Sequence, residues 1–278
     1  MKKLIINFAP TGMIPTKEMT PHVPIEPQEI VADVAECVRL GVSMVHLHAR
    51  DPGGSPTFRK ETFAEIISGI RGKHPELIIV VSTSGRNVSE FEKRSDVLNL
   101  QGDLKPDMAS LTLSSLNFSR SASVNSPETI IALASKMKQN GIKPELEIFD
   151  LGMVNYAKYL IRKGLLEPPY YFNILLGNVA TAQATLMHAG LIISELPPDS
   201  YYALTGIGND QKRMNALGVI EADGVRVGLE DNIWSNRERQ ELATNVSLVR
   251  QVAGLAAAYG RPIASAAEVR TMLKLKRA

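Results

Sequence analysis

The sequence predicts an α/β fold of the (β/α)8, or TIM barrel, class that forms one domain over residues 1–278. Short apolar runs with β character alternate with longer helical stretches, which is the pattern of βα units on a parallel sheet. Eight such runs occur at roughly regular intervals, and this barrel has eight βα units in about 250 residues. An open doubly wound sheet is not favoured, because Gly206-Ile207-Gly208 comes late and lacks the third glycine of a dinucleotide motif.

The expected elements follow one another as strand and helix. Strands are expected at residues 4–9, 42–48, 77–82, 107–113, 144–149, 171–176, 200–205 and 224–229. Helices are expected at residues 27–40, 60–72, 127–139, 151–163, 209–220 and 238–259, and those after the third and sixth strands have weaker patterns. The first helix illustrates the reasoning: Ile30, Val34 and Cys37 recur at helical spacing, Pro27 suits the first turn and Gly41 suits the end.

Composition excludes several classes of protein. Lys+Arg 31 against Asp+Glu 29 leaves a formal charge of +2, which is too balanced for a nucleic-acid platform or an electrostatic membrane binder. The longest apolar runs, such as Leu77 to Val81, are far shorter than a membrane span. A single cysteine excludes an intramolecular disulfide and a cysteine-rich zinc site, so a reducing cytoplasm is the expected compartment.

The strongest local signal is His46-Leu47-His48 at the end of the second predicted strand. Residues two apart on a strand point to the same face, so the two imidazoles are expected to project side by side. Such a pair suits zinc or another divalent cation, and the alternative is two hydrogen-bonded core histidines. Active sites of these barrels lie where the strands end, which favours the metal.

A metal needs a third ligand, and Glu230 is the candidate. It follows the eighth predicted strand, whose end reaches the same mouth because the eighth and second strands both flank the first. His22, His74 and His188 are poorly placed and are expected to be surface or capping residues. A solvated loop acid is the alternative reading of Glu230, but a His2Glu set leaves the open position that catalytic zinc sites require.

Further polar residues are expected at the same mouth. Arg226 and Asp231 can form a charge pair there, either to recognise a carboxylate or as a structural ion pair. Alternation places Glu145 and Glu147 on one face of the fifth strand, and Glu147, near its end, is a candidate general base or a support for the metal site. Hydroxyls follow the third and fourth strands, and they suit either a substrate carboxylate or helix capping.

These residues belong to a longer pattern that resembles the β-keto acid cleavage enzyme family. The matching motifs are Thr11-Gly12, His46-Leu47-His48-Ala49-Arg50-Asp51-Pro52, Pro56-Thr57, Ser82-Thr83-x-Gly85, Ser115-Leu116-Asn117-Phe118, Pro144-Glu145-Leu146-Glu147, Phe149-Asp150-Leu151-Gly152, Gly206-Ile207-Gly208 and Val225-Arg226-Val227-Gly228-Leu229-Glu230-Asp231-Asn232. They occur in order over nearly the full chain, which makes the resemblance much more specific than a lone H-x-H motif.

The resemblance implies an enzyme that takes a β-keto acid and acetyl-CoA and yields acetoacetate and a new acyl-CoA. It also implies one zinc ion per chain and a homo-oligomer, a tetramer or dimer. The matched metal ligands are His46, His48 and Glu230, and the matched acid–base group is Asp231 and Arg226, with Glu147. Residues expected to contact the substrate are Ser82 and Ser110, whose hydroxyls match the carboxylate site, with Thr11, Gly12, Ile14 and Asn117.

Two segments depart from the family pattern. The loop of residues 11–16 carries no charge, so Ile14 favours a keto acid with an uncharged or apolar tail. Residues 177–181 replace a usual glycine pair in a loop that could contact the CoA. Two other functions remain as alternatives: an amidohydrolase-type hydrolase, for which further histidines would be expected, and a non-catalytic barrel that binds an acyl-CoA.

Overall fold

The computed structural model describes residues 2–276 and forms a closed barrel of eight parallel strands. The order around the barrel is β1-β12-β11-β10-β9-β6-β5-β2, and β2 pairs with β1 to close it. The barrel strands are β1 (Ile5–Phe8), β2 (Met44–Leu47), β5 (Ile78–Val81), β6 (Met108–Thr112), β9 (Lys143–Ile148), β10 (Tyr170–Leu176), β11 (Ser200–Gly206) and β12 (Gly224–Val227). The predicted fold class is confirmed, and each of these strands overlaps its predicted range.

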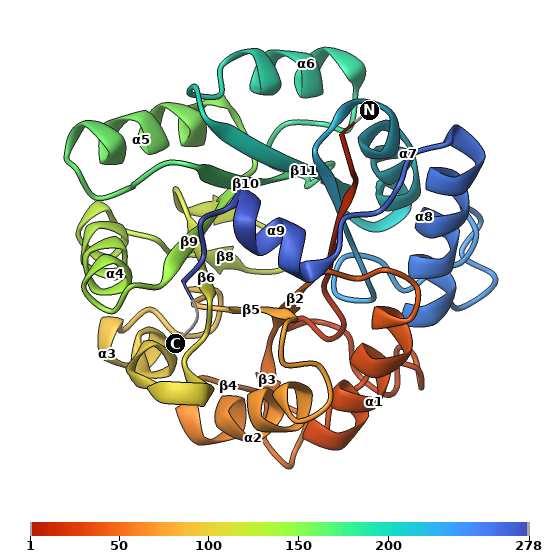
Figure 1. Ribbon diagram of the computed structural model, residues 1–278, viewed down its shortest axis with the longest axis horizontal. Helices are drawn as coiled ribbons and strands as arrows, with labels where there is room; N and C mark the ends of the chain where they lie inside the picture. The colour runs from red at the N-terminus through yellow and green to blue at the C-terminus, as the bar shows by residue number, and fades with distance from the viewer. Residues whose placement is uncertain (1, 277–278) are drawn as a thin grey trace.

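Helices surround the barrel, and two short hairpins extend it at the loops (Figure 1). The helices are α1 (Pro27–Val38), α2 (Lys60–Arg71), α3 (Phe91–Arg94), α4 (Pro127–Gln139), α5 (Leu151–Arg162), α6 (Leu186–Ser194), α7 (Gln211–Glu221), α8 (Asn245–Tyr259) and α9 (Ala266–Met272). The hairpins pair β3 (Ala49–Arg50) with β4 (Pro56–Thr57) and β7 (Leu116–Asn117) with β8 (Ala122–Ser123). Within residues 2–276, no helix has the length and apolarity to cross a membrane.

The last large helix begins later than the sequence suggested. The expected helix over 238–259 was wrong at its start, since α8 begins at Asn245. Thr244 caps it by accepting a hydrogen bond from the Ser247 amide, and the Ser247 hydroxyl accepts one from the Thr244 amide in return. Upstream, Arg239 has a φ of 58°. This left-handed conformation is incompatible with a continuing helix.

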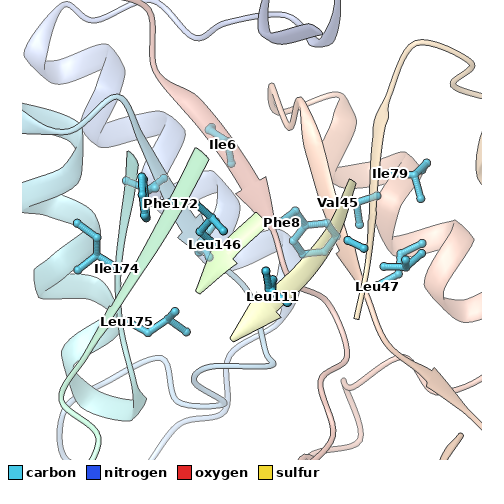
Figure 2. Close-up of a cluster of buried hydrophobic side chains, with 14 of the residues drawn as sticks. Ile6, Phe8, Val45, Leu47, Ile79, Leu111, Leu146, Phe172, Ile174 and Leu175 are labelled. Atoms are coloured by element: carbon cyan, nitrogen blue, oxygen red, sulfur yellow. The ribbon is translucent and has the colours of Figure 1, made fainter. Parts of the chain in front are cut away.

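Strand alternation divides the core into two parts. Outward side chains of the strands, among them Ile6, Phe8, Val45, Leu146 and Phe172, pack beneath the surrounding helices (Figure 2). Inward side chains at the amino ends of the strands form a second cluster with residues of the C-terminal segment. Its members are Ile5, Met44, Ile78, Val80, Met108, Tyr171, Ala203, Ala264, Val269 and Leu273. The inner cluster therefore fills one end of the barrel with apolar groups.

Helix α9, which the sequence patterns did not indicate, lies across this end of the barrel (Figure 1). Arg270 anchors it by donating to Asp107 Oδ1 at 2.6 Å, and Leu273 packs into the inner cluster. The amino ends of the strands are thus closed by the C-terminal segment. The carboxyl ends, where loops carry the chemistry of such barrels, stay free for a site.

This closure predicts that Leu273→Ala destabilises the protein by about 2–5 kcal/mol, because a fully buried leucine is removed from a packed cluster. The free energy of unfolding in urea measures the loss. Leu255→Ala is the matched control, since Leu255 is 37% exposed on α8 and should lose about 1 kcal/mol or less. Equal losses in the two variants would show that α9 does not stabilise the barrel.

Candidate active site

The predicted metal ligands meet at the carboxyl ends of the strands. His46 lies in β2, His48 follows that strand, and Glu230 lies three residues beyond β12. The Nε2 atoms of the two histidines are 3.3 Å apart, and His48 Nε2 is 3.1 Å from Glu230 Oε1. Ligand atoms bound to one tetrahedral zinc ion at ~2.0–2.1 Å lie roughly 3.3 Å apart. These two distances match the spacing of such a site, and all three donors lie within 4.8 Å of one another.

A second observation supports a cation at this place. Glu230 Oε2 is buried and has no hydrogen-bond partner within residues 2–276. A buried carboxylate oxygen without a partner is costly, and a metal ion would satisfy it. The donor set of two imidazoles and a carboxylate suits zinc. The residues present thus fit a divalent ion.

Glu145 orients His46, a role that the sequence analysis missed. The Glu145 carboxylate, fully buried, lies 2.6 Å from His46 Nδ1 and accepts a second bond from Asn7 Nδ2 at 2.6 Å. The pair fixes the ring so that Nε2 faces the site, as carboxylates do for metal-binding histidines. Burial opposes a charge on His46, but the Glu145 carboxylate outweighs it and raises the pKa of His46. The sequence signal for this role is strand alternation, which places Glu145 on the same face of the strand as Glu147.

Arg226 lies beneath the site with three carboxylates around it. Its Nε donates to Asp231 Oδ2 at 2.9 Å, its Nη2 to Glu230 Oε1 at 2.7 Å and its Nη1 to Glu147 Oε1 at 3.2 Å. The predicted charge pair of Arg226 and Asp231 is confirmed. Burial opposes the charges, yet the three carboxylates hold the pKa of Arg226 well above its usual value.

The pKa values of Glu230 and Asp231 are shifted in opposite directions. Burial disfavours the charge on Glu230, but Arg226 and the histidines hold the pKa of Glu230 well below its ordinary value. Burial raises the pKa of Asp231 despite the neighbouring guanidinium. Glu147 also accepts from the Thr112 hydroxyl at 2.7 Å. The site therefore holds an ionised ligand in Glu230 beside a more basic carboxylate in Asp231.

The hydroxyls expected to contact the substrate lie at two depths. Ser82, at the end of β5, is half-buried, whereas Ser110 in β6 is 1% exposed and its Oγ accepts from the Thr83 amide at 3.1 Å. Thr11 is fully buried, and its Oγ1 has no hydrogen-bond partner in the described chain. The adjacent ends of β5 and β6 thus present the two serines side by side.

The other expected substrate contacts lie on loops. Ile14 is 48% exposed, and Asn117 is exposed on β7, where its carbonyl oxygen accepts from Asn178 Nδ2 at 2.9 Å. No interaction within residues 2–276 links either side chain to the histidines. Their contact with a substrate remains a prediction.

A cavity with an empty volume of about 450 Å³, part of it open to solvent, lies beside His48 and Ser82. Most of its other lining side chains are apolar, among them Met13, Phe58, Phe63 and Val88. Met13 comes from the uncharged loop that follows β1. The site therefore continues from the polar centre into an apolar space.

Arg50 is a second residue whose role the sequence analysis missed. Its guanidinium donates to the carbonyl oxygens of Gly12, Pro15 and Gly54, each at 3.0 Å. These bonds tie the loop after β1 to the β3–β4 hairpin, so the loop is held against the site. Gly12 sits at the contact point: its φ is 63°, and a Cβ there would lie 2.6 Å from Glu230 Cγ.

Comparison with known proteins identifies the family. The family model for beta-keto acid cleavage enzymes matches residues 3–275. A 3-keto-5-aminohexanoate cleavage enzyme from Acetoanaerobium sticklandii is 35% identical over the full length of both chains. A 3-oxoadipate:acetyl-CoA acetyltransferase from Cupriavidus necator is 36% identical over 98% of this chain and 94% of its own length.

The barrel and the family match define an enzyme, whose candidate site lies at the carboxyl ends of the strands. The chain belongs to the beta-keto acid cleavage enzyme family. A solved structure of the protein ObcA shares the fold, with a TM-score of 0.80 over 92% of this chain and 66% of that chain, at 22% identity. Membership of this family argues against the two alternatives considered from sequence, the amidohydrolase-type hydrolase and the non-catalytic barrel.

The contact between Gly12 and Glu230 predicts that Gly12→Ala weakens Zn²⁺ binding by about 10- to 100-fold, because the new methyl group must displace the Glu230 side chain. Competition with a chromogenic chelator measures the affinity. Gly102→Ala is the matched control, since Gly102 has a φ of 57° but no atom within 4 Å of a Cβ. Unchanged Zn²⁺ affinity in Gly12→Ala, or an equal loss in both variants, would contradict the prediction.

Proposed function

We propose that this enzyme is zinc-dependent and converts a β-keto acid and acetyl-CoA into acetoacetate and a new acyl-CoA. The observation that carries the proposal is the set of His46, His48 and Glu230 donor atoms, which lie within 4.8 Å of one another at the mouth of a barrel of this family. Two relatives have acetyl-CoA in their names, which supports it as the second substrate: a 3-oxoadipate:acetyl-CoA acetyltransferase from Cupriavidus necator and a 3-dehydrocarnitine:acetyl-CoA trimethylamine transferase from Rhizobium meliloti.

The reaction exchanges one acyl group for another on the same two-carbon unit. A base removes a proton from the carbon between the keto group and the carboxylate, and this carbon attacks the thioester carbonyl of acetyl-CoA. A carbon–carbon bond forms, the carbon–sulfur bond breaks, and the CoA thiolate leaves. The thiolate then attacks the original keto carbon and the old carbon–carbon bond breaks, which releases the new acyl-CoA. The two-carbon unit, which now carries the acetyl group, takes back a proton as acetoacetate.

Each step needs groups that the site holds. A divalent ion on His46, His48 and Glu230 would supply Lewis-acid polarisation of the keto group. Asp231 is the proposed base, because its pKa is raised by burial and Arg226 orients it through two bonds at 2.9 and 3.3 Å. Glu147 supports Arg226 from the opposite side. The hydroxyls of Ser82 and Ser110 are the proposed hydrogen-bond donors to the substrate carboxylate.

The tail of the keto acid is proposed to be uncharged. Residues 11–16 bring no carboxylate to the site, and the cavity beside His48 has no acidic residue in its lining, half of which is apolar. A buried ammonium without a partner would be strongly disfavoured there. Ile14 and Met13 are the residues of this loop proposed to lie nearest the tail.

The chain is further proposed to act as a single-domain cytoplasmic enzyme and as a homo-oligomer, a dimer or tetramer. Exposed apolar side chains on α6 and the loop before it support association with a second copy: Val179 is 69%, Leu186 66% and Met187 73% exposed. Apolar groups clustered on a surface are typical of protein–protein contacts. Cys37, the chain's one cysteine, is buried and unpaired, which suits a reducing compartment.

The function is tested by supplying acetyl-CoA with a panel of β-keto acids that have aliphatic, amino-bearing or acidic tails, and by measuring acetoacetate release. We expect kcat/KM to be highest for uncharged tails and metal analysis to find about one zinc per chain. Removing zinc with a chelator should abolish the release, and returning zinc should restore it. Full activity in metal-free protein, or no acetoacetate from any member of the panel, would reject the proposal.

Asp231→Asn should lower kcat by about 10²- to 10⁴-fold, because the amide keeps the shape of the side chain but removes the basic oxygen. Zinc content and the binding of the keto acid should change little. Glu241→Gln is the control, since Glu241 is exposed and makes no ion pair in the part of the chain that the structure describes. Near-normal turnover of Asp231→Asn would make Asp231 a structural partner of Arg226 and direct the test to Glu147.

A further inference from the structure

Arg86, in the loop after β5, holds a guanidinium that none of the roles above uses. The side chain is half-buried, and its Cζ lies 3.4 Å from the centre of the Phe118 ring. The guanidinium donates no hydrogen bond and forms no ion pair with any residue between 2 and 276. The neighbouring Arg94, in contrast, donates from all three of its guanidinium nitrogens to Thr83, Val124 and Asn125. Arg86 therefore keeps its donors free.

The free guanidinium belongs to a loop that borders the site. Asn87 and Val88, which follow Arg86 in the chain, line the cavity beside His48. Burial lowers the pKa of Arg86, and the carboxylates of Glu230, Glu147 and Asp231 oppose this shift. These three carboxylates are paired with Arg226, and none of them forms an ion pair with Arg86.

The loop that carries Arg86 is held firmly. Arg94 Nε donates to the Thr83 carbonyl at 2.8 Å, and the Ser84 hydroxyl accepts from the Arg86 amide at 3.3 Å. The stacked Phe118 is itself packed edge-on against Phe149, with ring centres 5.9 Å apart. A cation that is stacked by its face on an aromatic ring leaves its edge, and therefore its N–H groups, free for a ligand. The arrangement presents those donors in a defined direction.

The pair lies on the same loops as the residues proposed to bind the substrate carboxylate. Ser82 directly follows β5 and Ser110 lies in β6, and Arg86 and Phe118 belong to the loops that follow the same two strands. The Ser110 hydroxyl already accepts from the Thr83 amide. Two neutral hydroxyls carry no charge to pair with a carboxylate. A guanidinium on the same loop as Ser82 would add charge-assisted hydrogen bonds to it.

We propose that Arg86 binds the carboxylate of the β-keto acid, an assignment that rests on the proposed function. The carboxylate accepts hydrogen bonds from the edge of the guanidinium and from Ser82, while Phe118 supports the face of the guanidinium. Arg86 is then a substrate-binding residue that selects acids over their neutral analogues. It makes no demand on the tail, which lies in the cavity beside His48.

The test measures the binding of acetoacetate and of its methyl ester by calorimetry, so it does not depend on turnover. In the natural protein, acetoacetate should bind more tightly than methyl acetoacetate. Arg86→Gln should weaken acetoacetate binding by about 10- to 100-fold and leave the binding of the ester within about 3-fold. Arg86→Lys should recover only part of the loss, since an ammonium lacks the planar edge. Arg120→Gln, at an exposed arginine on the same hairpin as Phe118, is the control and should leave both affinities unchanged.

Steady-state kinetics supply a second readout. Arg86→Gln should raise KM for the keto acid and leave KM for acetyl-CoA unchanged. Equal losses for acid and ester would show a structural role and overturn the proposal, and so would an effect confined to acetyl-CoA, which would assign the guanidinium to a phosphate of CoA. If the keto acid panel yields no acetoacetate, the proposed function fails, and the comparison of acid with ester still decides whether Arg86 binds a carboxylate.

Discussion

The site depends on the ion pairs that the buried guanidinium of Arg226 forms with three carboxylates. Arg226 is 1% exposed and joins Glu147 on β9 to Glu230 and Asp231 in the loop after β12, although two strands, β10 and β11, separate β9 from β12 in the barrel. A buried charge is tolerated only when it is paired and hydrogen-bonded, so these partners cannot move independently. Three carboxylates surround one guanidinium. The imbalance favours a further cation beside Glu230, where the histidines present two more donors.

The fold separates stability from chemistry along the barrel axis. The amino ends of the strands hold an apolar cluster under α9, with no charged side chain among its members. The carboxyl ends hold the histidines, Arg226 and its acids, which burial makes costly unless each is satisfied. Glu145 lies between the two layers and turns His46 toward the mouth. The apolar layer thus supports a polar layer whose buried charges are costly unless they are paired.

The loops add selectivity to this common centre. Arg50 draws the loop after β1 over Glu230, and the apolar cavity beside His48 opens next to it. The loops after β5 and β6 bring Arg86 against Phe118. A guanidinium with free donors can form charge-assisted hydrogen bonds with an anionic substrate. The loop after β5 therefore carries Arg86, assigned to the acid, and also lines part of the cavity assigned to the tail.

Sequence by itself determined the eight strands, because period-two and apolar patterns depend only on neighbouring residues. It also placed His46 and His48 on one face and Glu230 at the same mouth, since alternation and chain order suffice for that. It did not reveal Glu145 as the partner of His46, the three carbonyls held by Arg50, or the stacking of Arg86 on Phe118. Those contacts join residues far apart in the chain, and closure and register of the barrel decide them. The start of α8 at Asn245 likewise depended on a cap and on the backbone of Arg239, which periodicity does not encode.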